Sequence, residues 1–366
     1  MPMERVEQRL TLNGVTRTGN ELLHHCISEA QNPLLPEWER SLHRFILEWL
    51  NGNDYVTLFT SGSTGAPKEI RQLKRHMVAS AGLTRDYFWL NDQTQALLCL
   101  PISYIAGKMM VVRAFLTSNN LIATEPSANP FESIHTPITF AAITPYQLAH
   151  SMETLQRGGV ETIIVGGGEI PAELDEQCST LPARVYATYG MTETSSHVAL
   201  RPVNGPKQSR LYEILPGVEV STDSRGCLTI TAPALTNHTL VTNDVVRIAD
   251  SRHFEWIGRA DNVINSGGVK IFPEQVEKTL FPHIHRRYFV AGQPDDALGE
   301  RVVLFTEGEP LQADEQQRLQ NLFPTILQRY EIPRQLVAIP QFLLSDAGKL
   351  QKRATLEQYQ RGNLEE

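Results

Sequence analysis

Residues 138–190 constrain the fold most, because apolar runs and helical patterns alternate along them. The apolar run ITFAAI (138–143) precedes a stretch of helical periodicity at 145–156. The segment ETIIVGGG (161–168), a second helical stretch (170–178) and ARVYATYG (183–190) follow. Strands that alternate with helices form a parallel sheet covered by helices, so this region predicts an α/β domain. Ligands of such sheets bind beyond the carboxyl ends of the strands, where VGGGE and TYGMTE lie.

The flanking regions predict smaller units. Near the N-terminus, a short lead-in precedes one expected helix, in which apolar side chains recur at helical spacing over 38–49. Residues 211–257 carry short β-type runs separated by turn residues, which predicts a small antiparallel subdomain. A boundary is expected near 258–261, and the last hundred residues predict a separate small α+β unit with a helix at 273–280.

Composition excludes several classes of protein. The net charge is −8, from 33 Lys and Arg against 41 Asp and Glu, with no basic run suited to nucleic acid. The four cysteines are too widely spaced for a zinc site or a disulfide framework, so we expect reduced thiols: Cys26, Cys99, Cys178 and Cys227. The most apolar stretch (104–116) is short and interrupted by charges. We therefore expect a soluble, cytoplasmic protein with no membrane insertion.

The segment LFTSGSTGAPKEI predicts a phosphate-binding loop. Its glycines free backbone N–H groups, its hydroxyls add donors, and its lysine adds a positive charge, all of which suit a polyphosphate. The Walker A pattern is excluded because Pro67 stands where that loop needs its second glycine. A flexible, solvated Gly/Ser turn is the structural alternative. The candidate residues are Thr60, Ser61, Gly62, Ser63, Thr64, Gly65 and Lys68.

Four motifs in order resemble the superfamily of acyl-CoA synthetases, nonribosomal adenylation domains and luciferases. They are TSGSTGAPK (60–68), YGMTET (189–194), GRADNVINSGGVKI (258–271) and AGKLQKR (347–353). The resemblance implies an enzyme that uses ATP and Mg²⁺ to make an acyl-AMP and then transfers the acyl group to coenzyme A. It also implies a large domain (1–258) with parallel sheets and a small β-barrel-like subdomain. A mobile α+β lid (259–366) would turn about a hinge at Asp261.

Two segments, LPISYIAGKMMVVRA (100–114) and YGMTETSSHVALR (189–201), look like the o-succinylbenzoate–CoA ligases of menaquinone biosynthesis. Ligases for another aryl or medium-chain acid, and adenylation domains that load a carrier protein, share the four core motifs. A nucleotide-sensing protein without catalysis is a further alternative. A homodimer is possible.

The resemblance assigns nucleotide contacts residue by residue. In YGMTET it implies that Tyr189 stacks on adenine, Thr192 contacts the α-phosphate and Glu193 ligates Mg²⁺, as a ring face and a carboxylate can. A plain turn capped by a threonine is the alternative. The run Gly166, Gly167 and Gly168 would let the adenine or acyl group lie against the backbone.

Further roles come from the ends of the two domains. Asp244 in TNDVV would accept hydrogen bonds from the ribose hydroxyls with help from Arg259, although Asn243 replaces the family's usual glycine. Lys349 would bridge the carboxylate and the α-phosphate during adenylation, unless the C-terminal basic residues form only a solvated cluster. Gly268 would lie where the pantetheine arm of coenzyme A enters.

The acid would need an apolar slot and a cation for a second carboxylate. Arg113 is the first candidate and Lys108 the second, although both are equally compatible with surface charges on a helix. Ser195, Ser196 and His197 are candidates for the pocket wall, and Tyr104 for a gate between the half-reactions. Glu69 departs from the family by placing a negative charge beside the phosphate loop. The nucleotide loop begins near residue 57, so much of the family's N-terminal subdomain is missing.

Overall fold

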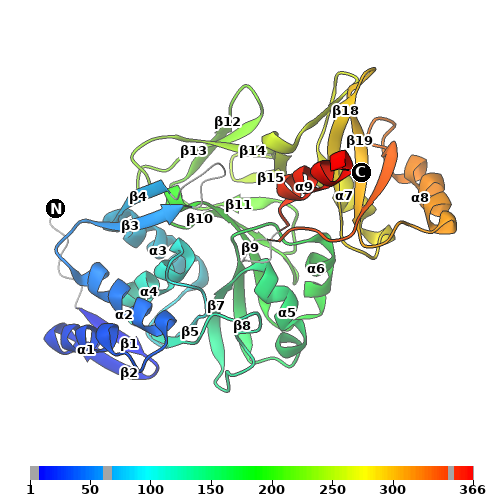
Figure 1. Cartoon of the computed structure of the whole chain (residues 1–366). Coiled ribbons are helices and arrows are strands. Elements are labelled where there is room, and N and C mark those ends of the chain that lie inside the picture. Colours follow the sequence, from blue (N-terminus) through cyan, green and yellow to red (C-terminus); the bar gives the residue numbers. More distant parts are fainter. Residues whose placement is uncertain (1–7, 61–67, 345–349, 366) are drawn as a thin grey trace.

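A sheet of 13 strands runs through the computed structural model of the chain, which describes residues 8–60, 68–344 and 350–365 (Figure 1). Six strands of this sheet run parallel to their neighbours, in the order β1 (Arg9–Leu12), β6 (Asn120–Ala123), β5 (Gln95–Leu98), β7 (Ile138–Ile143), β8 (Val160–Val165) and β9 (Arg184–Gly190). The antiparallel strand β2 (Val15–Thr18) forms the edge beyond β1. The predicted α/β class is confirmed.

The predicted β-α-β-α-β order is also confirmed. Strands β7, β8 and β9 are joined by α5 (Pro145–Gln156), α6 (Ala172–Gln177) and the 3-10 turn η1 (Cys178–Thr180). Successive side chains of β8 pack on opposite faces of the sheet. Ile163 and Val165 pack with α5 and α6, whereas Ile164 packs in the hydrophobic cluster on the other face. Because both faces are covered, these strands are apolar throughout rather than alternating with polar residues.

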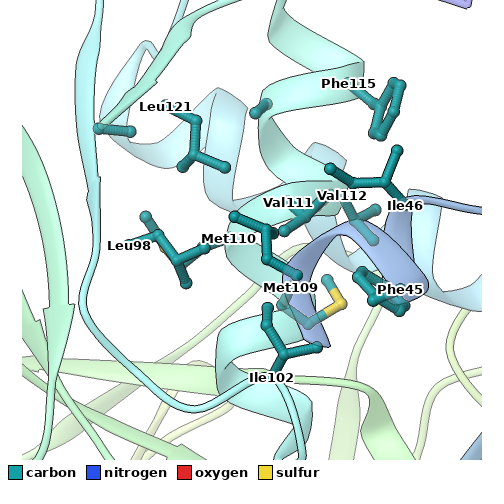
Figure 2. Close-up of a cluster of buried hydrophobic side chains, with 14 of the residues drawn as sticks. Phe45, Ile46, Leu98, Ile102, Met109, Met110, Val111, Val112, Phe115 and Leu121 are labelled. Carbon is teal, nitrogen blue, oxygen red and sulfur yellow. The ribbon is translucent and has the colours of Figure 1, made fainter. Parts of the chain in front are cut away.

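Helix α4 (Ile105–Thr117) is buried on nearly all sides. Figure 2 shows its residues Met109–Phe115 against α2 on one side and the strand residues Leu98 and Leu121 on the other. Apart from Lys108 and Arg113, the buried side chains of α4 are mostly apolar, and a helix that is apolar on most sides belongs inside a protein. This position explains the most apolar stretch of the sequence. No helix in the described part of the chain has the length and apolar character needed to cross a membrane.

The N-terminal region holds more structure than the single expected helix. It contains α1 (Gly19–Gln31) and α2 (Glu37–Leu50), which pack on each other before the antiparallel hairpin of β3 (Tyr55–Thr60) and β4 (Lys68–Leu73) and then α3 (Lys74–Phe88). The first helix was missed because buried positions are sparse on it: only Leu22 and Cys26 are buried.

The predicted antiparallel β region is confirmed and continues the main sheet. Strand β10 (His197–Pro202) pairs antiparallel with β9, and the remaining strands follow across the sheet: β11 (Tyr212–Ile214), β15 (His253–Arg259), β14 (Leu240–Ile248), β13 (Cys227–Thr231) and β12 (Glu219–Thr222). Among the described strands, these pairings do not close on themselves into a barrel. Through β10 the region is hydrogen-bonded directly to the parallel strand β9 and continues the main sheet.

A second sheet follows the 3-10 turn η3 (Ala260–Asn262). Its strands are β17 (Val269–Ile271), β16 (Ile264–Ser266), β19 (Gly299–Glu307), β18 (Tyr288–Asp295) and β20 (Gln335–Ile339), and its helices are α7 (Pro273–Leu280), η4 (Phe281–His283), α8 (Ala313–Ile326) and α9 (Lys352–Glu365). This unit has hydrophobic clusters of its own. The domain limits at 258 and 259 and the hinge at Asp261 remain predictions.

Candidate active site

The glycine-rich ends of β8 and β9 lie side by side at the carboxyl edge of the parallel strands. A Cβ atom on Gly166 would stand 2.5 Å from Thr188 Oγ1, and one on Gly190 would stand 2.3 Å from the carbonyl oxygen of Ser196. Neither position therefore accepts a side chain without displacement of its neighbours. Gly167 and Gly168 follow directly and are exposed, so this edge presents bare backbone where the fold predicts a ligand.

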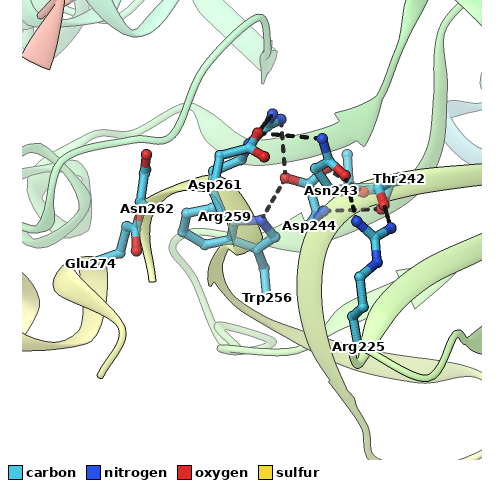
Figure 3. Close-up of polar contacts among 10 residues, drawn as sticks. Arg225, Thr242, Asn243, Asp244, Trp256, Arg259, Asp261, Asn262 and Glu274 are labelled. Atoms are coloured by element: carbon cyan, nitrogen blue, oxygen red, sulfur yellow. Dashed lines mark hydrogen bonds and ion pairs between the residues drawn. The ribbon is translucent and has the colours of Figure 1, made fainter. Parts of the chain in front are cut away.

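Tyr189 and Asp244, which are 55 residues apart in the chain, meet at this edge. The Tyr189 hydroxyl donates to Asp244 Oδ2 at 2.8 Å. The Trp256 indole N–H donates to Asp244 Oδ1 at 3.3 Å, and Arg259 Nη1 lies 3.5 Å from the same oxygen (Figure 3). Burial and the Asp244 carboxylate raise the pKa of Tyr189 above its usual range. The structure thus brings together three residues predicted from separate motifs, and it adds Trp256, which no motif signalled.

The same cluster extends to the predicted hinge. Arg259 lies between two carboxylates, because its Nη2 is 2.9 Å from Asp261 Oδ2. Asn243, which replaces the usual glycine, donates from Nδ2 to Asp261 Oδ2 at 3.3 Å. In this conformation, side-chain contacts therefore tie Asp261 to β14 through Asn243 and to the end of β15 through Arg259.

The turn after Gly190 carries the predicted phosphate and metal residues. Thr192 and Glu193 are half-buried in the 3-10 turn η2 (Thr192–Thr194). Thr194 is buried and fixes the turn, since its hydroxyl accepts from Met191 N at 3.1 Å and contacts the carbonyl oxygen of Ser196 at 2.6 Å. The N-cap of this turn is Met191, so Thr194 fixes the turn from its third position and is not the capping threonine of the plain-turn alternative. Thr192 and Glu193 are left accessible.

A row of buried polar side chains lies behind this turn. Arg113 Nη2 donates to Ser196 Oγ at 2.9 Å, Ser196 Oγ lies 3.2 Å from His197 Nδ1, and His197 Nε2 lies 3.3 Å from Thr84 Oγ1. Thr84 in turn donates to the backbone carbonyl oxygen of Ser80 at 3.3 Å. The distances are consistent with a neutral His197 protonated on Nε2. Three of the predicted pocket residues, Arg113, Ser196 and His197, therefore belong to one network, and Thr84 was not foreseen.

Arg113 is 2% exposed, and no acidic side chain in the described part of the chain pairs with it. Among the described residues, its Nη1 has only the thioether sulfur of Met110 at 3.4 Å, and its Nε has no hydrogen-bond partner. Burial lowers the pKa of Arg113 to about 10, so the guanidinium remains charged at neutral pH. Burial and the Arg113 charge lower the pKa of His197 to about 3, so its imidazole is neutral. A buried charge without a counter-ion is costly.

Lys108, the second cation candidate, has its charge balanced by a carboxylate. Lys108 Nζ lies 3.3 Å from Glu48 Oε2 and 4.4 Å from the centre of the Phe45 ring. It is buried, like Arg113, but its charge already has a partner on α2. Tyr104 precedes α4 and is 57% exposed, so the structure does not bring it into the row of Arg113.

Several predicted residues lie elsewhere or outside the described residues. Thr60 and Lys68 pair in register at the open end of the β3–β4 hairpin, while residues 61–67 and Lys349 fall outside the described residues. Gly268 has φ +80° in the two-residue turn between β16 and β17, far along the chain from the parallel strands. Glu69 is exposed and 3.4 Å from Arg71 Nε, which places it on the outer face of β4.

Comparison with known proteins confirms the class. The chain belongs to the AMP-binding enzyme family, whose model matches residues 9–222, and it is an adenylate-forming carboxylate–CoA ligase by class. It is 26% identical over 316 residues to the 2-succinylbenzoate–CoA ligase of Escherichia coli (strain K12), covering 82% of this chain and 68% of that ligase. It is 25% identical over 323 residues to the Lactococcus lactis ligase of the same name, covering 81% of this chain and 70% of that ligase.

Similar solved structures also belong to adenylate-forming enzymes. An acyl-CoA synthetase (AMP-forming)/AMP-acid ligase II-like protein from Dyadobacter fermentans shares 38% identity, with 91% of this chain and 97% of that chain covered and a TM-score of 0.58. The o-succinylbenzoate–CoA synthetase of Bacillus subtilis, in complex with its acyl-adenylate intermediate, shares the fold at 21% identity. That match covers 81% of this chain and 68% of that chain, with a TM-score of 0.69.

Proposed function

We propose that this chain uses ATP and Mg²⁺ to convert o-succinylbenzoate into its coenzyme A thioester. A carboxylate oxygen of the acid attacks the α-phosphorus of ATP, and the bond to pyrophosphate breaks to leave an acyl-AMP. The coenzyme A thiolate then attacks the acyl carbon, and AMP leaves. Splitting the reaction turns a poor electrophile into a mixed anhydride before the thiol attacks.

The choice of acid rests on the buried, unpaired charge of Arg113 among the described residues. A fully buried guanidinium with donor positions unused by the described residues, and no acidic partner among them, suits an anion from outside the chain. Because the reacting carboxylate must reach the nucleotide, a second carboxylate on the acid is the anion that fits Arg113. The surrounding α4 is apolar, which suits an aromatic ring. The named relatives act on an acid of this kind.

The contacts that we propose for the nucleotide are those that the sequence motifs predict. Tyr189 would lie against adenine, and Asp244 with Arg259 would bind the ribose hydroxyls. Although Tyr189 and Trp256 already donate to Asp244, a carboxylate has about four acceptor sites, so capacity for a ribose hydroxyl remains. Thr192 would contact the α-phosphate, and the hairpin loop with Lys68 would hold the outer phosphates. Lys349 would reach both reacting anions during adenylation.

Glu193 fits a magnesium ligand. Its carboxylate has no ion pair within the described residues, and a single carboxylate together with phosphate oxygens is a usual way to hold Mg²⁺. The described part of the chain has no group of three or more metal-binding side chains, so phosphates and water would complete the coordination. Bound there, Mg²⁺ would neutralise phosphate oxygens during displacement.

Product analysis over a panel of acids tests the proposal. Purified protein with Mg·ATP and coenzyme A is assayed for AMP release and thioester mass using o-succinylbenzoate, benzoate, medium-chain fatty acids and amino acids. We expect o-succinylbenzoyl-CoA as the preferred product. A different preferred acid would keep the mechanism and overturn the acid. Acid-dependent pyrophosphate exchange without a thioester on free coenzyme A would indicate a carrier protein as acceptor.

A further inference from the structure

Ser195, directly after the metal-binding turn, has an unusual backbone conformation. It is fully buried, it is not glycine, and its φ and ψ are +62° and −37°. Non-glycine residues with positive φ are uncommon, and such strain persists only where the surroundings impose it. Residues Thr192–Thr194 immediately precede it, and the Ser195 N–H donates to the carbonyl oxygen of Thr192 at 3.0 Å, so a contact that holds Ser195 also restricts the turn that carries Glu193.

The residue that holds Ser195 is Gln72. The Gln72 amide Nε2 donates to Ser195 Oγ at 2.6 Å, and Gln72 is itself 5% exposed. Along β4 the inward positions are Ile70 and Gln72, whereas Glu69 and Arg71 face out. A single buried hydrogen bond therefore joins two segments that are 123 residues apart (Figure 1 shows the β3–β4 hairpin that carries Gln72).

The presence of a glutamine amide at the inward position of residue 72 requires a physical explanation. Ile70 on the same face of β4 and Val56 opposite Gln72 are apolar, and an apolar side chain would fill the site without the cost of burying a polar group. What an amide adds is direction, because its N–H must point at an acceptor. That acceptor belongs to the one strained residue of the turn, and the hairpin that supplies the amide ends at the predicted phosphate loop.

We propose that Gln72 is a positioning residue that fixes the turn of Glu193 against strand β4 of the hairpin. It acts through Ser195 and does not touch the nucleotide or the metal. The inference rests on the proposed function, in which Glu193 ligates Mg²⁺. Loss of the Gln72 amide should therefore weaken magnesium-dependent nucleotide binding specifically, because Glu193 is no longer aimed at the phosphates.

The test is the binding of a non-hydrolysable ATP analogue to Gln72→Met, measured by calorimetry over a range of Mg²⁺ concentrations. Methionine keeps the length of the side chain and removes the amide. We expect binding about tenfold weaker than wild type at low Mg²⁺, the effect of one misdirected buried contact. Excess Mg²⁺ should shrink the difference to about twofold, because added metal compensates for a weakened ligand. No acid is needed, so the result does not depend on substrate identity.

Gln147→Met is the matched control. Gln147 is also 5% exposed, and its amide Nε2 donates to the carbonyl oxygens of Cys99 and Ser127 at 3.0 Å, away from the turn. It should lower Tm without changing the magnesium dependence. Adding Ser195→Ala to Gln72→Met should cause no further loss, because both substitutions break the same contact. Ser195→Ala alone removes one oxygen and keeps the test decisive if Gln72→Met fails to fold.

The outcomes separate the two hypotheses. A wild-type protein that fails to bind the Mg·ATP analogue would refute the proposed function. Normal wild-type binding with an unchanged magnesium dependence in Gln72→Met would overturn only the role of Gln72. An equal loss at all Mg²⁺ concentrations would do the same, because it would show that Gln72 merely supports the fold.

Discussion

Replacing Arg113 with methionine should lower activity and raise stability together. The guanidinium is buried among the apolar residues of α4, with no acidic partner in the described part of the chain. If it binds the second carboxylate of the acid, Arg113→Met leaves that carboxylate buried and unpaired at a cost of ~3–5 kcal/mol. In kcat/KM this corresponds to a loss of roughly two to four orders of magnitude.

The stability of the free enzyme should move the other way. Removing an uncompensated buried charge in favour of an apolar side chain is neutral or stabilising by ~1–4 kcal/mol. The hydrogen bond to Ser196 is lost, at ~1 kcal/mol. The free energy of unfolding should therefore rise by up to about 3 kcal/mol, seen as a Tm a few degrees higher.

The assay compares two acids on both proteins. One acid is o-succinylbenzoate, and the other is 3-benzoylpropanoate, which has the same skeleton with a single carboxylate. Arg113→Met should lose activity on the dicarboxylate only. Lys108→Met is the contrast: it strands Glu48, so Tm should fall while the ratio of kcat/KM for the two acids stays as in wild type. Equal losses on both acids in Arg113→Met, or a Tm several degrees lower, would refute the reasoning.

Three further predictions concern Glu193, Gly190 and the buried His43. Glu193→Gln should raise the Mg²⁺ concentration needed for half-maximal pyrophosphate exchange by about tenfold or more, and an unchanged requirement would exclude it as the ligand. Gly190→Ala should lower adenylation and cost ~2 kcal/mol or more of stability, because its Cβ would stand 2.3 Å from a backbone oxygen; chemical denaturation measures this loss. Burial lowers the pKa of His43 to about 4, below the unfolded value near 6.5, so its stabilising effect is complete above pH 6.5 and is lost as the pH falls towards 4. Between about pH 6.5 and 4, the free energy of unfolding of wild type should fall with pH more steeply than that of His43→Phe, by ~1.4 kcal/mol per pH unit. Thermal unfolding over this pH range measures the difference, and parallel stability profiles of the two proteins would contradict the prediction.

The parallel core was predictable from the sequence because its signals are local. The strand at 138–143 and the helix at 145–156 have the predicted bounds, since the first is a bounded apolar run and the second begins at a Thr-Pro cap with a capping box. Helix α1 was missed because only two of its side chains are buried. Such a helix has little amphipathic pattern to detect.

The contacts of the site were predictable only where a motif fixed both partners. Tyr189, Asp244 and Arg259 were each expected near the nucleotide, and the structure places them within hydrogen-bonding or ion-pairing distance. Gln72 and Trp256 were missed because their roles depend on partners far along the chain. A polar residue at an inward strand position was the only local signal for Gln72. Sequence alone could not tell that its amide meets a strained serine.

In the proposed function, the positions after Glu193 would connect the two substrates in one short segment. Ser195 is held from the hairpin that leads to the phosphate loop, and Ser196 is held by Arg113, the cation proposed for the acid. His197 continues from Ser196 to Thr84 on α3. Because these residues are consecutive, a shift of an acid bound at Arg113 would pass to the turn that carries Glu193 through two peptide units, without any long-range motion. Binding of the correct dicarboxylate should thereby strengthen magnesium-dependent nucleotide binding, and thermodynamic linkage requires the reverse coupling to be equal.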